Sequence, residues 1–236
     1  MLEIHELGVH YGAIEALKGV SMVVPTGSKA AILGANGAGK SSLLRAISGL
    51  SPITAGRITL NGEDITTMPA AERARRGIAQ AMEGRRLFRQ LSVEENLRLA
   101  WNFGLRSNAL HPALDQAYAR FPILGERSRI AAGLLSGGQQ QMLILSCATI
   151  RSPRLLLLDE PSLGLAPIIV TQIYAYINEF ARTSGAAVVL TEQMAALALK
   201  VSDHAFVLRR GAVVLEGASP ALIERGVANE LSAAYL

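Results

Sequence analysis

The chain has 236 residues, 50% of them hydrophobic, with a formal net charge of +4 from 23 lysines and arginines and 19 acidic residues. This length suits one large domain with an ample core, and so small a charge does not by itself indicate a nucleic-acid-binding protein. Cys147 is the single cysteine, so an intrachain disulfide is excluded. Because the sequence has no membrane-length apolar run and no signal-peptide pattern, we expect a cytoplasmic chain that reaches a membrane only through a partner.

The opening segment alternates between short strands and turns. Apolar runs predict strands near residues 2–7, 20–24, 29–33 and 57–60. Asn61-Gly62 is a hairpin-type turn after the last of these.

Residues 34–41 read G-x-x-x-x-G-K-S, the pattern of a phosphate-binding loop. The pattern consists of Gly34, Ala35, Asn36, Gly37, Ala38, Gly39, Lys40 and Ser41, and Ser42 continues it into a predicted helix. A strand, a glycine-rich loop and a helix start aim backbone N–H groups at an anion. Lys40 supplies a positive charge for the outer phosphates, and the Ser41 hydroxyl suits Mg²⁺. The alternative, a chance glycine turn before a helix, leaves this context unexplained.

The pattern from about residue 69 to 154 is mostly helical and predicts a helical lobe inserted in an α/β core. Ser92 and Glu95 form a capping box that places a helix start at Ser92. A further helix is expected over residues 111–121, ended by Pro122.

Residues 135–141 read L-S-G-G-Q-Q-Q and predict a second helix start that can bind an anion. Ser136 is a good N-cap, and Gly137 and Gly138 let backbone amides approach a ligand. Because one nucleotide seldom needs two such sites, the economical interpretation is that this helix start serves a phosphate held by a second subunit. An ordinary capped helix with flexible glycines is the alternative for this stretch taken alone.

The last third returns to buried strands, predicted over residues 155–158 and 187–190, with a hairpin around 209–211 and a C-terminal helix from Pro220. Buried strands that alternate with helices argue for an α/β fold with a largely parallel sheet. Asp159 and Glu160 follow the first of these strands, at the sheet edge where such folds bind ligands. Asp159 can hold Mg²⁺, and Glu160 can orient or deprotonate the water that attacks a γ-phosphate; a plain strand cap is the alternative.

The phosphate loop, L-S-G-G-Q and L-L-L-L-D-E-P, in this order, resemble those of an ATP-binding subunit of an ATP-binding-cassette (ABC) transporter over essentially the whole chain. The resemblance implies an α/β phosphate-loop NTPase core of ABC ATPase type, with an antiparallel β subdomain and an inserted helical lobe. We expect a single domain over residues 1–236. Its parts would be a core of about 1–83 and 154–216, a lobe of about 84–153 and a helical tail of about 217–236.

The same resemblance implies a head-to-tail dimer that sandwiches two ATP molecules with Mg²⁺. Ser136, Gly137 and Gly138 would contact the partner's γ-phosphate. Tyr11 sits where the family places an aromatic ring against adenine, although ordinary packing is the alternative. Closure by ATP would then be passed to membrane subunits.

Two positions depart from the general family pattern. Gln193 stands where the family has a histidine that senses the γ-phosphate, and Glu83 stands where it has a glutamine that contacts metal and water. We expect Gln193 to act in catalysis and Glu83 to lie beside Mg²⁺, with slower hydrolysis at one of two sites as a possible consequence.

These departures resemble one branch, the ATPases of importers for branched-chain amino acids, with urea and amide importers close by. That branch implies membrane permease subunits, a second and different ATPase subunit, an external solute-binding protein and a place on the inner face of the membrane. A homodimer is the alternative pairing. The arginines between residues 73 and 89 fall into two groups by expected role. We expect Arg73, Arg75 and Arg76 to lie on a solvated face, and Arg85 and Arg86 to dock to the membrane subunit.

Three other classes are less compatible with the sequence. A soluble cassette ATPase acting on nucleic acid or ribosomes would usually carry two cassettes or a long coiled-coil insertion. A kinase or switch GTPase would have no use for L-S-G-G-Q. A regulatory binder with an inactive site stays open because of Gln193 and Glu83.

Overall fold

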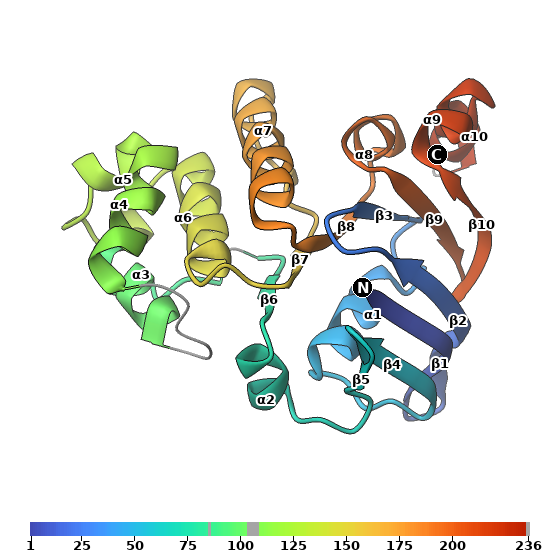
Figure 1. Ribbon diagram of the computed structural model, residues 1–236. Helices are drawn as coiled ribbons and strands as arrows, with labels where there is room; N and C mark the ends of the chain where they lie inside the picture. Colours follow the sequence, from blue (N-terminus) through green and yellow to red (C-terminus); the bar gives the residue numbers. More distant parts are fainter. Residues whose placement is uncertain (85, 103–108, 235–236) are drawn as a thin grey trace.

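The computed structural model describes residues 1–84, 86–102 and 109–234, which form two sheets and a set of helices (Figure 1). The strands are β1 (Leu2–Tyr11), β2 (Ile14–Val24), β3 (Lys29–Leu33), β4 (Ala55–Leu60), β5 (Glu63–Asp64), β6 (Ile78–Ala81), β7 (Leu155–Asp159), β8 (Ala187–Glu192), β9 (His204–Arg209) and β10 (Ala212–Ala218). The helices are α1 (Lys40–Ser48), α2 (Ala70–Arg75), α3 (Val93–Asn102), α4 (Leu110–Arg120), α5 (Pro122–Glu126), the 3₁₀ turn η1 (Ala132–Leu134), α6 (Gly137–Thr149), α7 (Pro167–Ser184), α8 (Ala195–Val201), α9 (Ser219–Glu224) and α10 (Val227–Ala234).

The larger sheet has the strand order β10-β9-β3-β8-β7-β6. Its strands pair in parallel except at the edge, where β10 runs antiparallel to β9. The expected largely parallel sheet is therefore confirmed. Alternate residues of its central strands enter different cores: Ala31 and Leu33 pack on the side of the helices, whereas Ala30 and Ile32 pack toward α1 and the smaller sheet. Burial on both faces explains why these strands are continuous apolar runs.

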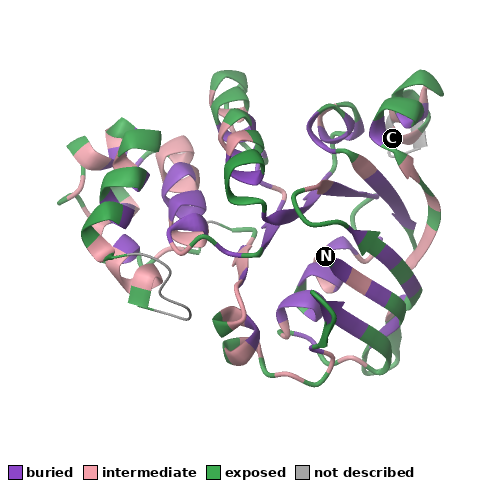
Figure 2. Ribbon diagram, viewed as in Figure 1, coloured by how far each residue is buried: buried purple, intermediate pink, exposed green. Residues whose placement is uncertain are grey.

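The smaller sheet is antiparallel, with the order β2-β1-β4-β5. The second half of β2 alternates between buried and exposed residues, as expected of a strand with one solvated face, whereas register shifts interrupt the alternation in β1 (Figure 2). The predicted turn at Asn61-Gly62 is confirmed, because Leu60 pairs with Glu63 across it. The second strand begins at Ile14, well before the predicted residue 20, because its first half pairs with the end of β1.

Helices α3 to α6 lie together on one side of the molecule, beyond β6 and α7 in Figure 1. The capping box predicted at Ser92 is confirmed: the Ser92 N–H donates to Glu95 Oε2 at 2.7 Å, and the Glu95 N–H donates to Ser92 Oγ at 3.2 Å. Pro122 ends α4 as predicted and also opens α5, where its fixed φ suits the first helical turn.

The stretch from residue 69 to 154 is not entirely helical, because it contains β6. This strand pairs in parallel with β7 and forms an edge of the larger sheet. Its four residues are too few for a periodic pattern to separate strand from helix.

Arg73 does not lie on a solvated face, and this prediction was wrong. Its side chain is buried, with the residue 2% exposed, and the guanidinium donates to the carbonyls of Met68, Thr66, Ala46 and Ile47 at 2.6–2.9 Å. The last two carbonyls belong to the final turn of α1, where a cation satisfies otherwise unpaired C=O groups. Arg75 is exposed and Arg76 is half-buried.

Across the described ranges, none of the helices combines the length and apolarity needed to cross a membrane.

Candidate functional site

A pocket of about 1030 Å³ opens around the phosphate loop. The residues expected from the sequence that line it are Tyr11, Ala35, Asn36, Gly37, Gly39, Lys40, Ser41, Ser42, Glu83, Glu160 and Gln193. The loop leaves the end of β3 and enters α1, so the pocket lies at the carboxyl edge of the parallel sheet. Gly34 and Ala38 are buried in the loop rather than part of the pocket wall.

The loop is held in shape by its glycines and by the hairpin between β9 and β10. Gly39 has φ +110°, and a Cβ there would come within 2.8 Å of the Ala16 carbonyl oxygen. Only glycine fits such a close approach. The Gly211 N–H donates to the Ala38 carbonyl at 2.9 Å, and the Lys18 N–H donates to the Gly211 carbonyl at 2.8 Å. These contacts fix the loop with the N-terminus of α1 toward the pocket, which suits an anion.

Lys40 is the charged centre of the loop. It is 5% exposed, and its ammonium donates to the carbonyls of Gly34 at 2.8 Å and Ala35 at 3.3 Å. The same ammonium lies 3.4 Å from Glu160 Oε1. A buried positive charge therefore stands between the phosphate loop and the carboxylate that follows β7.

Ser41, Asp159 and Glu83 supply oxygen ligands at one place. The Ser41 hydroxyl donates to Asp159 Oδ1 at 3.2 Å, and all three residues line a hollow of about 290 Å³. In the described part of the chain no group of three or more His, Cys, Asp or Glu side chains is arranged to hold a metal ion. This sparse, all-oxygen set fits Mg²⁺, which is usually bound by one or two carboxylates together with substrate phosphates and water.

Glu160 is fixed by contacts from the end of β8. Gln193 Nε2 donates to both of its carboxylate oxygens, at 3.0 and 2.8 Å, and to Asn36 Oδ1 at 3.0 Å. Glu160 has φ +48°, a left-handed conformation that costs about 1–3 kcal/mol for a residue with a side chain. Its N–H donates to Thr191 Oγ1 at 3.1 Å, and Thr191 Oγ1 donates to Asp159 Oδ1 at 2.8 Å.

Tyr11 lies at the mouth of the pocket and is 39% exposed. Its hydroxyl is hydrogen-bonded to Ser51 Oγ at 2.6 Å. The position permits stacking against a base, and the role stays a prediction.

Ser136, Gly137 and Gly138 do not line this pocket among the described residues. Ser136 caps α6: its hydroxyl accepts from the Gln139 N–H at 3.4 Å, and its own N–H donates to Gln139 Oε1 at 3.1 Å. A Cβ at Gly138 would lie 3.1 Å from the side chain of Ile169 in α7. The chain therefore presents a capped helix start away from its own phosphate loop.

Part of the pocket wall is not predicted from the sequence. The additional lining residues are Ile14, Glu15, Ala16, Lys18, Leu163, Arg210 and Gly211. The sequence predicts a hairpin turn at Arg210 and Gly211, but no local signal shows that β9 pairs with β3 and brings this turn to the phosphate loop.

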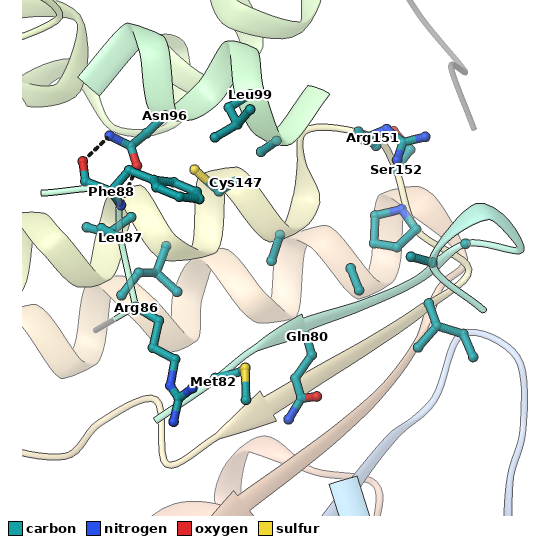
Figure 3. A pocket seen from close by; sticks show the side chains of 18 of the residues that line it. Gln80, Met82, Arg86, Leu87, Phe88, Asn96, Leu99, Cys147, Arg151 and Ser152 are labelled. Atoms are coloured by element: carbon teal, nitrogen blue, oxygen red, sulfur yellow. Dashed lines mark hydrogen bonds between the residues drawn. The ribbon is translucent and has the colours of Figure 1, made fainter. Parts of the chain in front are cut away.

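A second cavity, of about 490 Å³, lies between β6, α3 and α6 (Figure 3). Arg86, Leu87 and Phe88 line one side of it, Cys147 comes from α6, and Gln80 comes from β6. Neither polar atom of the Gln80 amide has a hydrogen-bond partner within the described chain, although both are buried. Burial raises the pKa of the Cys147 thiol to about 12. Arg85, expected nearby, lies outside the described residues.

The segment beside this cavity is fixed by Asn96 of α3. Its side chain accepts from the Phe88 N–H at 3.0 Å and donates to the Phe88 carbonyl at 3.0 Å (Figure 3). Although its backbone is held in this way, Phe88 is 61% exposed to solvent. We call the cavity with residues 86–88 the lobe groove.

Comparison with known proteins gives consistent results. A family model described as "ABC transporter" matches residues 17–163. The chain is 43% identical over 223 residues to the "High-affinity branched-chain amino acid transport ATP-binding protein BraG" of Pseudomonas aeruginosa, covering 94% of this chain and 95% of that protein. It is 34% identical over 224 residues to the "Probable branched-chain amino acid transport ATP-binding protein LivF" of Archaeoglobus fulgidus, covering 95% and 94%. A solved structure described as an ATP binding subunit of an ABC transporter matches with a TM-score of 0.85 at 31% identity, covering 100% and 99%.

Proposed function

This chain belongs to the ABC transporter family and is an ATPase, and we propose that it drives the import of branched-chain amino acids. The solute is supported by the names of both relatives, BraG and LivF, which match nearly the whole chain. The pocket around the phosphate loop suits a nucleotide, and we assign the selection of the solute to other subunits.

The observation that carries the proposed mechanism is the placement of Glu160 beside Lys40, at the edge of the pocket. We assign the phosphates of ATP to Lys40 and to the N–H groups of the loop. Glu160 orients the attacking water and accepts its proton as the water oxygen bonds to the γ-phosphorus. The bond from that phosphorus to the β,γ-bridging oxygen breaks, which releases ADP and phosphate. Ser41 and Asp159 would hold Mg²⁺, with Glu83 beside it. When bound, Mg²⁺ neutralises charge that develops on the phosphate oxygens.

Ser136, Gly137 and Gly138 are assigned to the site of a second ATPase subunit. Their separation from this chain's own pocket supports a composite site in which each chain completes the other. We propose a different ATPase chain as the partner, with a second copy of this chain as the alternative outcome.

The lobe groove is proposed to receive a membrane permease subunit. The exposed Phe88 ring and the apolar cavity suit an apolar segment, and the unpaired amide of Gln80 can hydrogen-bond to its backbone. Arg86 at the rim adds a positive charge. This docking would place the chain on the inner face of a membrane, with an external solute-binding protein acting through the permease.

The test is the mass of Glu160→Gln in solution, with and without ATP, by light scattering. The variant should bind ATP and lose turnover, because it lacks the carboxylate that accepts the proton of water. A shift from monomer to dimer on addition of ATP would show that a second copy of this chain completes the site, which is the alternative pairing. Glu224→Gln, at an exposed position in α9, is the matched control. ATP binding without dimerisation would indicate an obligatory different partner, to be identified by co-purification; normal turnover would remove Glu160 from its assigned role.

A further inference from the structure

The last two residues of β8 and the residue after it contact the end of β7 and the segment that follows. Thr191 holds Asp159 and the N–H of Glu160, and Gln193 holds the Glu160 carboxylate. Glu192, between them, accepts a hydrogen bond from the N–H of Ser162 at 3.3 Å. Because side chains alternate along a strand, Glu192 points to the opposite face of the sheet from its two neighbours.

Glu192 is a buried acid on the face covered by α7. The residue is 3% exposed, and no ion pair within the described chain involves it. Its Oε1 atom accepts hydrogen bonds from the Tyr174 hydroxyl and from Ser162. Burying a carboxylate in this way lowers the stability of the fold compared with an apolar side chain of similar size. Packing alone therefore does not explain why a glutamate is at this position.

Tyr174 is suited to hold this carboxylate. It lies in α7 and is 4% exposed. Burial, with the nearby Glu192 carboxylate, raises the pKa of Tyr174, so the phenol keeps its proton and remains a donor. The pair thus links α7 to the first residues after Glu160.

The segment that Glu192 holds contributes to the nucleotide pocket. Its first turn is closed by a hydrogen bond from the Leu163 N–H to the Glu160 carbonyl at 3.1 Å. Leu163 lines the pocket and is 50% exposed. The Ser162 N–H therefore lies between the left-handed Glu160 and a side chain that faces outward.

We propose that Glu192, supported by Tyr174, is a positioning residue for ATP hydrolysis that fixes residues 160–163 through the Ser162 N–H. Thr191 and Gln193 hold Glu160 from one face of the sheet, and Glu192 holds the next turn from the other face. Loss of the Glu192 contact lets the turn relax and moves the Glu160 carboxylate away from the attacking water. The inference rests on the proposed role of Glu160.

The experiment compares Glu192→Met with Glu192→Gln in steady-state ATP hydrolysis and in ATP binding. Methionine fills the space without an acceptor, whereas glutamine keeps a carbonyl oxygen for both donors. Because small misplacements of catalytic groups can cost about a hundredfold in rate, we expect kcat to fall roughly tenfold to a hundredfold in Glu192→Met. ATP affinity should change less than about twofold, and Glu192→Gln should restore most of the rate. Wild-type kcat in Glu192→Met would overturn the inference, as would equal losses in both variants.

Tyr174→Phe provides a second measurement, which decides the question if Glu192→Met does not fold. It removes one donor to Glu192 and keeps the ring, so kcat should fall several-fold with unchanged ATP affinity. The matched control is Tyr176→Phe, which removes a hydroxyl from the same helix, where it contacts Thr149. Equal kcat values for these two variants would overturn the inference. Glu160→Gln is measured in parallel: full turnover there contradicts the proposed role of Glu160, whereas lost turnover with an unaffected Glu192→Met contradicts only the role of Glu192.

Discussion

The side-chain amide of Gln193 donates to both carboxylate oxygens of Glu160, at 3.0 and 2.8 Å. The Gln193 side chain is a neutral amide. It gives the carboxylate two hydrogen bonds without a group that titrates near neutral pH. The same amide also donates to Asn36 in the phosphate loop. Gln193 therefore links the phosphate loop to the carboxylate that follows β7.

Replacing Gln193 tests this contact. Gln193→Glu should lower kcat by on the order of a hundredfold, because a second carboxylate would repel Glu160 and remove the donor. Gln193→His should retain more activity, since a ring N–H can still donate. The measurement is steady-state ATP hydrolysis with ATP affinity determined separately; equal rates for the two variants would contradict the positioning role.

Arg73 should be a major contributor to stability. Arg73→Met removes hydrogen bonds to carbonyls of Met68, Thr66, Ala46 and Ile47, and leaving such groups unpaired should lower the free energy of unfolding by about 3 kcal/mol. Arg75→Met, at an exposed position on the same helix, should change it by less than about 0.5 kcal/mol. Chemical denaturation of both variants checks this, and a similar small change in each would contradict it.

The Cys147 thiol should react slowly with alkylating reagents. Its pKa is raised by burial from 9.0 to about 12, and only the thiolate is nucleophilic. At pH 8 the folded chain should therefore react about a thousandfold more slowly than an exposed cysteine, and the rate should rise about tenfold per pH unit. Denaturant should abolish the protection. Rapid labelling of the folded chain at pH 8 would show that the thiol is not shielded as described.

Tyr11 can be tested for contact with the base of ATP. If the ring stacks on adenine, Tyr11→Phe should keep the affinity for ATP, whereas Tyr11→Ala should weaken it about tenfold, in line with stacking energies of about 1–3 kcal/mol. Both variants lose the hydrogen bond to Ser51, so a difference in ATP affinity between them reports on the aromatic ring alone. Equal ATP affinity in the wild type and both variants would show that Tyr11 does not stack on adenine and only packs against its neighbours.

The lobe groove should matter for transport more than for ATP binding. If the rim charge of Arg86 meets the membrane subunit as proposed, Arg86→Glu should reduce solute uptake by the assembled transporter while ATP affinity changes less than about twofold. Arg127→Glu, at an exposed position after α5, is the control for a general change in charge. Uptake that is equal in the two variants would exclude a docking role for Arg86.

Features that depend on neighbouring residues can be predicted from the amino-acid sequence. The strand, loop and helix start around Lys40, the Ser92 capping box and the Asn61-Gly62 turn each follow from side chains a few positions apart. The order of the three motifs was sufficient to identify the family. Local backbone preferences and hydrogen bonds of short span are readable without knowledge of the fold.

Contacts between residues that are far apart in the sequence follow from the folded arrangement of strands and helices. Parallel pairing of β3 with β9 brings Arg210 to the phosphate loop, and packing of α2 against the end of α1 buries Arg73. The contact of Glu192 with Tyr174 and Ser162 likewise depends on α7 covering one face of β8. Strand order and helix placement are set by packing of the whole chain, and one local sequence pattern is compatible with several arrangements. The role of a side chain at a contact between distant segments therefore could not be predicted from its neighbours in the sequence.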